Sequence, residues 1–167
     1  VVRGREKQGM FTWEERIELI RTACVELPSV EVEGFDELTV EFAKRKVNLV
    51  LVARREDKLA QLRTRLLDLS PGLTIDVIAA DLSVPGSAAE LAAKVSDLGR
   101  KVDILINNAG VGLHGDFVKQ GVAENSAQIQ LNCVTLVELS GLFMPAMTAA
   151  GRGLVINVAS TAAFQPT

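Results

Sequence analysis

Short runs rich in polar and charged residues follow four of the strands that the hydrophobic pattern predicts. They contain Arg54, Arg55, Asp81, Leu82, Asn107, Asn108, Ala109, Gly110 and Ser160. An arginine offers a planar fork of donors that matches a phosphate group. Asp81 with Leu82 could place a carboxylate and backbone groups beside an adenine ring, and Gly110 lets a ligand approach the backbone closely. Ligands of parallel sheets bind where the carboxyl ends of the strands meet, so these positions predict a nucleotide site.

Each of these residues also has a purely structural explanation. Arg54 and Arg55 could begin a solvated helix, Asp81 could occupy a turn, and Ser160 could be a loop hydroxyl. Asn107 and Asn108 could likewise form a turn. Their occurrence in order, always after a strand, favours one shared site.

The elements that must position these residues alternate along the chain. The pattern predicts strands at 30–34, 47–53, 74–80, 102–106 and 153–159, and helices at 13–26, 37–45, 59–69, 88–98 and 124–149. The residues expected to face inward from the helices include Leu38, Phe42, Ala43, Leu59, Leu62, Leu66, Leu69, Ala88, Leu91, Val95 and Leu98. Alternation of this kind predicts an α/β fold with a three-layer, Rossmann-like parallel sheet that carries helices on both faces. We expect one domain over 1–167.

Composition excludes several classes of protein. The chain has 167 residues and a net charge of −3, so it is not expected to bind nucleic acid. The chain has two cysteines, Cys24 and Cys133, and one histidine, His114, which excludes a disulfide scaffold and argues against a His/Cys metal site. Both thiols are expected to be buried and reduced. No targeting signal is evident. The apolar run 131–150 is interrupted by polar residues and proline, which favours a buried helix over a membrane span.

Five segments carry a resemblance to a known family. They are FAKRKVNLVLVARREDKL from Phe42, the Asp81-Leu82 pair, ILINNAGVG at 104–112, LNCVTL around Asn132, and GLVINVAS ending at Ser160. Over residues from about 42 to 167 the chain resembles a classical short-chain dehydrogenase/reductase.

That resemblance implies a role for each residue of the predicted site. Arg54, with help from Arg55, would meet the 2′-phosphate of NADP, and Asp81 with Leu82 would meet the adenine. Asn107, Ala109 and Gly110 would support or line the cofactor segment. Asn132 and Ser160 would be two members of a catalytic tetrad.

Two of the family's motifs are missing from the sequence. A Tyr-x-x-x-Lys motif should follow Ser160, yet the chain contains no tyrosine. A glycine-rich turn should precede Phe42, but an ungapped alignment places Glu33, Glu37 and Thr39 where its glycines belong. Glycines in such a turn allow the backbone to approach a diphosphate, so tight cofactor binding is not expected.

Residues 1–46 resemble a different family. The runs GMFTWEERIELIR and LPSVEVEGF are similar to the middle of phosphopantetheine adenylyltransferase, in which a lysine matching Lys7 helps to bind phosphates. Two families would then meet near residues 42–47, with segment 1–46 of one and segment 47–167 of the other. This interpretation makes the chain a chimera.

The resulting prediction is a chimeric α/β scaffold without native enzymatic activity. One alternative is a residual NADP- or nucleotide-binding module, and another is a fragment of an NADP-dependent short-chain oxidoreductase. No tightly bound cofactor is expected, and NADP is the candidate if any binds. Self-association through the helix at 124–149 is expected, a membrane or nucleic-acid partner is not, and the source families suggest a cytoplasmic location.

Overall fold

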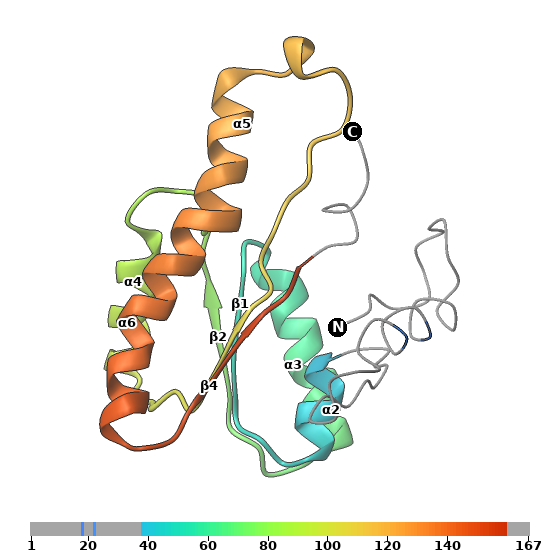
Figure 1. Ribbon diagram of the computed structural model, residues 1–167. Coiled ribbons are helices and arrows are strands. Elements are labelled where there is room, and N and C mark those ends of the chain that lie inside the picture. The colour runs from blue at the N-terminus through green and yellow to red at the C-terminus, as the bar shows by residue number, and fades with distance from the viewer. Residues whose placement is uncertain (1–17, 19–21, 23–37, 160–167) are drawn as a thin grey trace. The chain divides into compact units, whose positions relative to one another are not determined.

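The computed structural model describes residues 18, 22 and 38–159 of the chain (Figure 1). These residues belong to two compact units. The first unit comprises Val1–Leu49 and Arg65–Thr74, and the second comprises Val50–Thr64 and Ile75–Thr167. Of the helix predicted at 13–26 only Glu18 and Thr22 are described, and both are helical. The strand predicted at 30–34 lies outside the described residues.

In the first unit, helix α2 (Leu38–Lys44) ends in a tight left-handed turn. Lys46 has a φ of 58°, which is uncommon for a residue other than glycine. The Lys46 N–H donates to Ala43 O at 2.9 Å, and the Val47 N–H donates to Phe42 O at 3.0 Å. This pair of bonds satisfies carbonyls that the end of a helix otherwise leaves free. The predicted helix at 37–45 is thus confirmed.

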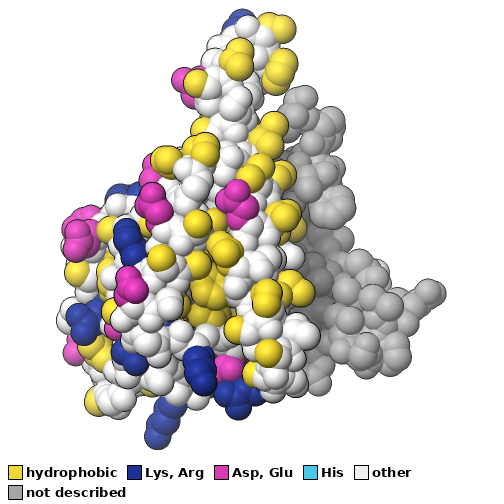
Figure 2. Space-filling model, turned by 90° about the vertical axis from the view of Figure 1, so that its left-hand side faces the viewer, with side chains coloured by type: hydrophobic (Ala, Val, Ile, Leu, Met, Phe, Trp, Pro, Cys, Tyr) yellow, Lys and Arg dark blue, Asp and Glu magenta, His cyan; other side chains and the backbone are white. Residues whose placement is uncertain are grey.

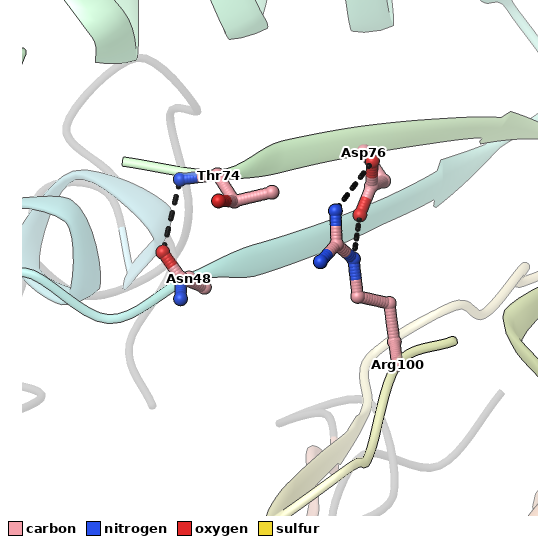
Figure 3. A network of polar contacts seen from close by, with 4 residues as sticks. All are labelled: Asn48, Thr74, Asp76 and Arg100. Carbon is pink, nitrogen blue, oxygen red and sulfur yellow. Dashed lines mark hydrogen bonds and ion pairs between the residues drawn. The ribbon is translucent and has the colours of Figure 1, made fainter. Parts of the chain in front are cut away.

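A second feature of the first unit joins the beginnings of two strands. The Asn48 side-chain Oδ1 accepts the Thr74 N–H at 2.9 Å, and the Leu49 N–H donates to Thr74 O at 2.9 Å (Figure 3). Asn48 therefore extends the strand pairing by one side-chain bond beyond the backbone ladder.

The four described strands form two pairs. β1 (Leu49–Ala53) lies beside β2 (Ile75–Ala79), and the Ala80 N–H closes the pair by donating to Ala53 O at 3.0 Å. β3 (Ile104–Asn107) runs parallel to β4 (Leu154–Asn157), with Asn107 opposite Asn157 in the register. All four strands fall inside the ranges predicted from the sequence, except that Asn107 extends β3 by one residue.

The helices alternate with these strands along the chain. They are α3 (Glu56–Leu69), α4 (Ser87–Asp97), the short 3-10 turn η1 (Phe117–Lys119), α5 (Val122–Ile129), the π turn η2 (Gln130–Val134) and α6 (Thr135–Ala149). α6 packs against α4 and against β3 and β4, as Figure 1 shows. The long helix predicted at 124–149 is confirmed as the helical run Val122–Ala149, in which η2 is a local widening. Apolar periodicity cannot reveal a single wide turn.

Two helices of the second unit end in a glycine and are followed by an arginine that forms an ion pair. Gly99, at φ 65°, ends α4, and Arg100 Nε lies 2.6 Å from Asp76 Oδ2 in β2 (Figure 3). The hydrogen bond that Arg100 donates to the Asp76 carboxylate raises the pKa of Arg100. Gly151, at φ 64°, ends α6, and Arg152 Nε lies 3.1 Å from Asp103 Oδ1 just before β3. Both pairs lie at the ends where strands begin, opposite the predicted site.

The core of the second unit contains residues from strands and helices alike. Its buried members are Ile78, Leu82, Ala88, Leu91, Val95 and Leu139. Half-buried Val50, Val52, Leu105, Leu131 and Phe143 pack against them. Two inward-facing residues were predicted wrongly, since Leu69 and Leu98 are exposed. Leu69 is the last residue of α3, and Leu98 follows the last residue of α4.

The helical run Val122–Ala149 is rich in apolar residues, although much of it is exposed. It spans 28 residues, and by length and composition alone it could cross a membrane. The prediction of a buried helix holds for one stripe only, in which Thr135, Leu139 and Met147 are buried. On its other side Val137 is 67% exposed and Met144 47% exposed. Figure 2 shows hydrophobic side chains recurring over this surface.

Candidate functional site

Arg54 and Arg55 form the connection between the end of β1 and the beginning of α3. Both are exposed, and neither guanidinium has a hydrogen bond or ion pair with another residue in the part of the chain that the structure describes. An exposed guanidinium without a partner can take a phosphate without first breaking a contact. The connection is short because α3 begins at Glu56, and this keeps both arginines at the carboxyl end of β1.

Asp81 lies just beyond β2 and is held by a local turn. Its Oδ1 accepts the Ser83 hydroxyl at 2.6 Å and the Ser83 N–H at 3.0 Å. These two bonds lower the pKa of Asp81, and the positive charge of Arg54 lowers it further. The carboxylate is therefore ionised and fixed by one oxygen, which leaves Oδ2 to accept a hydrogen bond from a ligand.

Leu82 contributes to the site through its backbone, because its side chain is buried in the core. Its carbonyl accepts the Thr135 hydroxyl at 2.8 Å. Thr135 is the first residue of α6 and is 1% exposed. Sequence reasoning missed Thr135, and the available signal was a hydroxyl residue on the inward stripe of an otherwise apolar helix.

Asn107 ends β3 and is buried. Its Nδ2 donates to Asn157 Oδ1 at 2.9 Å and to Ser140 Oγ at 3.2 Å, which ties β3 to β4 and to α6. Its Oδ1 is buried and has no hydrogen-bond partner among the described residues. Asn107 thus ties β3 to its neighbours, and its side chain does not itself face outward.

The loop after β3 is held by two amide side chains that lie four residues apart on the helical run. Asn132 accepts the Val111 N–H at 3.0 Å through Oδ1 and donates to Val111 O at 2.8 Å through Nδ2. Gln128 Oε1 accepts the Leu113 N–H at 2.9 Å. Residues four apart lie on the same face of a helix. The two side chains on this face therefore bind the backbone of Val111 and Leu113, which are two residues apart in the loop.

Gln128 is a further site residue that sequence reasoning missed. The signal that could have revealed it was its spacing of four from Asn132, which lies in η2. A π turn widens the helix and is frequent at functional sites. Cys133 also lies in η2, and the prediction that it is buried is wrong, since the wide turn leaves its thiol exposed.

Most residues of the predicted site lie just after the carboxyl ends of the described strands β1, β2 and β3. The exposed cations Arg54 and Arg55, the oriented Asp81 carboxylate and the exposed backbone of Ala109 and Gly110 all follow carboxyl ends of strands. A Cβ on Gly110 would lie 3.3 Å from Asn132 Oδ1, so glycine suits this close approach. The donor set fits a nucleotide that carries a phosphate, because it combines an oriented acceptor with exposed cations that have no hydrogen bond or ion pair within 38–159.

The remaining predicted residues cannot be placed in the site. Ser160, Glu33 and Glu37 lie outside the described residues, and Thr39 lies within α2. Lys7, Cys24 and the segment at 1–17 also lie outside them. Among the residues that are described, no cluster of three His, Cys, Asp or Glu side chains could hold a metal ion.

Comparison with known proteins identifies the family. The model of the short chain dehydrogenase family matches residues 36–167. Ketoacyl reductase HetN of Nostoc sp. strain PCC 7120 is 31% identical over 120 residues, which cover 72% of this chain and 41% of that protein. Very-long-chain 3-oxoacyl-CoA reductase of Pyrenophora tritici-repentis is 30% identical over 134 residues, which cover 78% of this chain and 39% of that protein.

Solved structures agree with the sequence relatives. A short-chain dehydrogenase from Sphingobium yanoikuyae in complex with NADPH superposes with a TM-score of 0.69 at 35% identity, covering 76% of this chain and 49% of that one. An alcohol dehydrogenase from Comamonas testosteroni, specific for bulky-bulky ketones, has a TM-score of 0.69 at 34% identity, covering 76% and 50%. The predicted three-layer α/β fold is confirmed. This chain spans about half the length of these solved structures and about 40% of the curated relatives.

The interpretation of the chain as a chimeric scaffold without native activity is wrong. The relatives are reductases and dehydrogenases, and the family match begins at residue 36, inside the segment at 1–46 that resembled an adenylyltransferase. The adenylyltransferase resemblance has no support from these comparisons, whereas the dehydrogenase resemblance is confirmed. Because the family model covers residues 36–167, the chain belongs to the short-chain dehydrogenase family.

Proposed function

We propose that this chain forms the NADP-binding part of a short-chain oxidoreductase. The observation that carries the proposal is the exposed Arg54 guanidinium, without a partner among the described residues, at the end of β1 and close enough to Asp81 to lower its pKa. A cation there favours a cofactor with an extra phosphate on its adenosine end. Related structures that hold NADPH or NADP support this choice of cofactor.

Each residue of the site has a role in this proposal. Arg54 and Arg55 hold the 2′-phosphate, Asp81 Oδ2 accepts from the adenine amino group, and Leu82 supports the ring through its backbone. The exposed backbone at Ala109 and Gly110 borders the rest of the cofactor. When bound, NADPH supplies a hydride.

The proton required for reduction of a carbonyl has to come from elsewhere. Asn132 and Ser160 match two members of the family's tetrad, but none of the 167 residues is a tyrosine. A general acid typically accelerates such a reaction by about 10²–10⁴-fold. We therefore infer that catalysis by the whole enzyme depends on residues beyond those in this sequence, and that these 167 residues supply cofactor binding.

Titration calorimetry with NADPH and NADH tests the proposal. We expect NADPH to bind more tightly, and Arg54→Ala to weaken NADPH binding by about tenfold or more, because a charge-assisted hydrogen bond contributes about 1.5–3 kcal/mol. Arg63→Ala, which removes another exposed arginine from α3, is the matched control and should leave binding unchanged. Equal affinity for NADPH and NADH, or no binding of either, would contradict the proposal.

We also propose that a second copy of the chain covers the exposed apolar side of the helical run. Val134, Val137 and Met144 are exposed there. Soluble proteins seldom leave an apolar stripe of a helix in water. Placing the same substitution on this surface and outside it tests the proposal.

A further inference from the structure

Thr135 carries a hydroxyl that is buried deep in the second unit. The residue is 1% exposed, and its Oγ1 donates to Leu82 O at 2.8 Å while Gln130 Nε2 approaches it at 3.3 Å. A hydroxyl within a helix ordinarily donates to the carbonyl four residues before it. Ser140 does so, since its Oγ donates to Leu136 O at 2.8 Å. Thr135 instead reaches a loop 53 residues away in the sequence.

The bond acts on a peptide unit whose other side faces the candidate site. Leu82 C=O and the Ser83 N–H belong to the same planar peptide, so fixing one fixes the direction of the other. That N–H donates to Asp81 Oδ1 at 3.0 Å. The Thr135 hydroxyl therefore sets the orientation of the peptide plane, and the peptide plane in turn sets the orientation of the Asp81 carboxylate.

The same threonine connects this loop to the helix that holds the other loop. Thr135 follows η2 directly, and Asn132 within η2 binds the backbone of Val111 through both side-chain polar atoms. The loops after β2 and β3 are thus anchored within four residues of one helical run.

We propose that Thr135 is a positioning residue that holds the Asp81 carboxylate in place for the adenosine end of the cofactor. The proposal rests on the NADP site proposed above. Thr135 itself touches no cofactor, because its hydroxyl is buried behind the Leu82 peptide. Its contribution is to keep one carboxylate oxygen pointed outward without rearrangement when the ligand arrives.

The test compares Thr135→Val, which keeps the shape and removes the donor, with Thr135→Ser, which keeps the donor. The probe is 2′,5′-ADP, which carries only the adenosine end and its phosphates. We expect Thr135→Val to weaken its binding about tenfold and Thr135→Ser to restore it. Thr148→Val alters an exposed threonine of α6 and should change nothing.

A second readout follows the Asp81 carboxyl by NMR as the pH is lowered. Losing the Ser83 N–H bond should raise the pKa of Asp81 toward its ordinary value in Thr135→Val and not in Thr135→Ser. If Thr135→Val does not fold, Thr135→Cys serves instead, since a thiol is only a weak donor. A folded variant that lacks the donor yet keeps both the affinity and the Asp81 pKa overturns the proposal.

The two readouts separate this proposal from the one on which it rests. If the unaltered chain fails to bind 2′,5′-ADP, the proposed function fails. The pKa of Asp81 in the Thr135 variants still decides whether the threonine positions the carboxylate.

Discussion

Two asparagines that stand next to each other at the end of β3 illustrate how differently neighbouring polar residues can act. Asn107 is buried, and its Nδ2 donates hydrogen bonds to Asn157 and Ser140, whereas Asn108 is exposed. The sequence predicts that both follow a strand, but it cannot assign which one points inward. Alternation along a strand decides that, and the strand continues one residue further than its apolar run.

Replacing Asn107 by alanine should therefore destabilise the fold. The change leaves Asn157 Oδ1 and Ser140 Oγ without this donor and opens a small cavity, so we expect a loss of about 2 kcal/mol in the free energy of unfolding. Asn108→Ala is the matched control, and it should stay within about 0.5 kcal/mol because the residue is exposed. Urea unfolding of both variants makes the comparison, and equal effects would show that Asn107 does not tie the strands together.

At the scale of helices and strands, the apolar pattern of the sequence predicts most elements but not the π turn. Every described strand and every described long helix occurs where the apolar pattern predicts it, because burial on one side determines that pattern. The π turn η2 escapes prediction, since the helical period continues on both sides of it. The sequence could place Arg54, Asp81 and Asn132 at the site, but not Gln128 or Thr135, whose partners lie in loops far away in the chain.

The π turn is expected to be essential for holding the loop after β3. Deleting Cys133, whose side chain is exposed, would convert η2 toward an ordinary helical turn. Asn132 and Thr135 would then stand two residues apart instead of three, about 200° from each other around an ordinary helix. Asn132 and Thr135 could then no longer reach Val111 and Leu82 together.

Hydrogen exchange of the backbone amides would measure whether the loop after β3 is still held. In the deletion variant we expect the helix content to remain while the Val111 N–H, which donates to Asn132 Oδ1, loses protection. Cys133→Ala, which keeps the chain length, should behave like the unaltered protein. Unchanged protection in the deletion variant would mean that the wide turn has no part in holding the loop.

At the scale of the second unit, the two ends of the strands differ in how their charged side chains are paired. The ends where strands begin carry the ion pairs of Arg100 with Asp76 and Arg152 with Asp103. The ends where strands finish carry two arginines that have no hydrogen bond or ion pair among the described residues, an oriented carboxylate and exposed backbone. This difference favours ligand binding at the ends where strands finish.

The exposed side of the helical run supports the last prediction, which concerns assembly. The apolar stripe through Leu139 and Met147 is buried, so the stripe through Val137 and Met144 is the surplus one. Burying about 600 Å² of apolar surface per chain would contribute roughly 15 kcal/mol before the costs of association, which remove much of it. We therefore expect a symmetric dimer or a larger species at tens of micromolar.

Val137→Glu should shift this species toward monomer, because a carboxylate would have to be buried in the interface. Val84→Glu makes the same change at an exposed valine outside the helical run and serves as the control. Analytical ultracentrifugation measures the mass, and circular dichroism verifies that the helix content is unchanged. A monomer for the unaltered chain would instead indicate that other residues of the same chain cover the surplus stripe. In that case Val137→Glu would lower the free energy of unfolding without changing the mass.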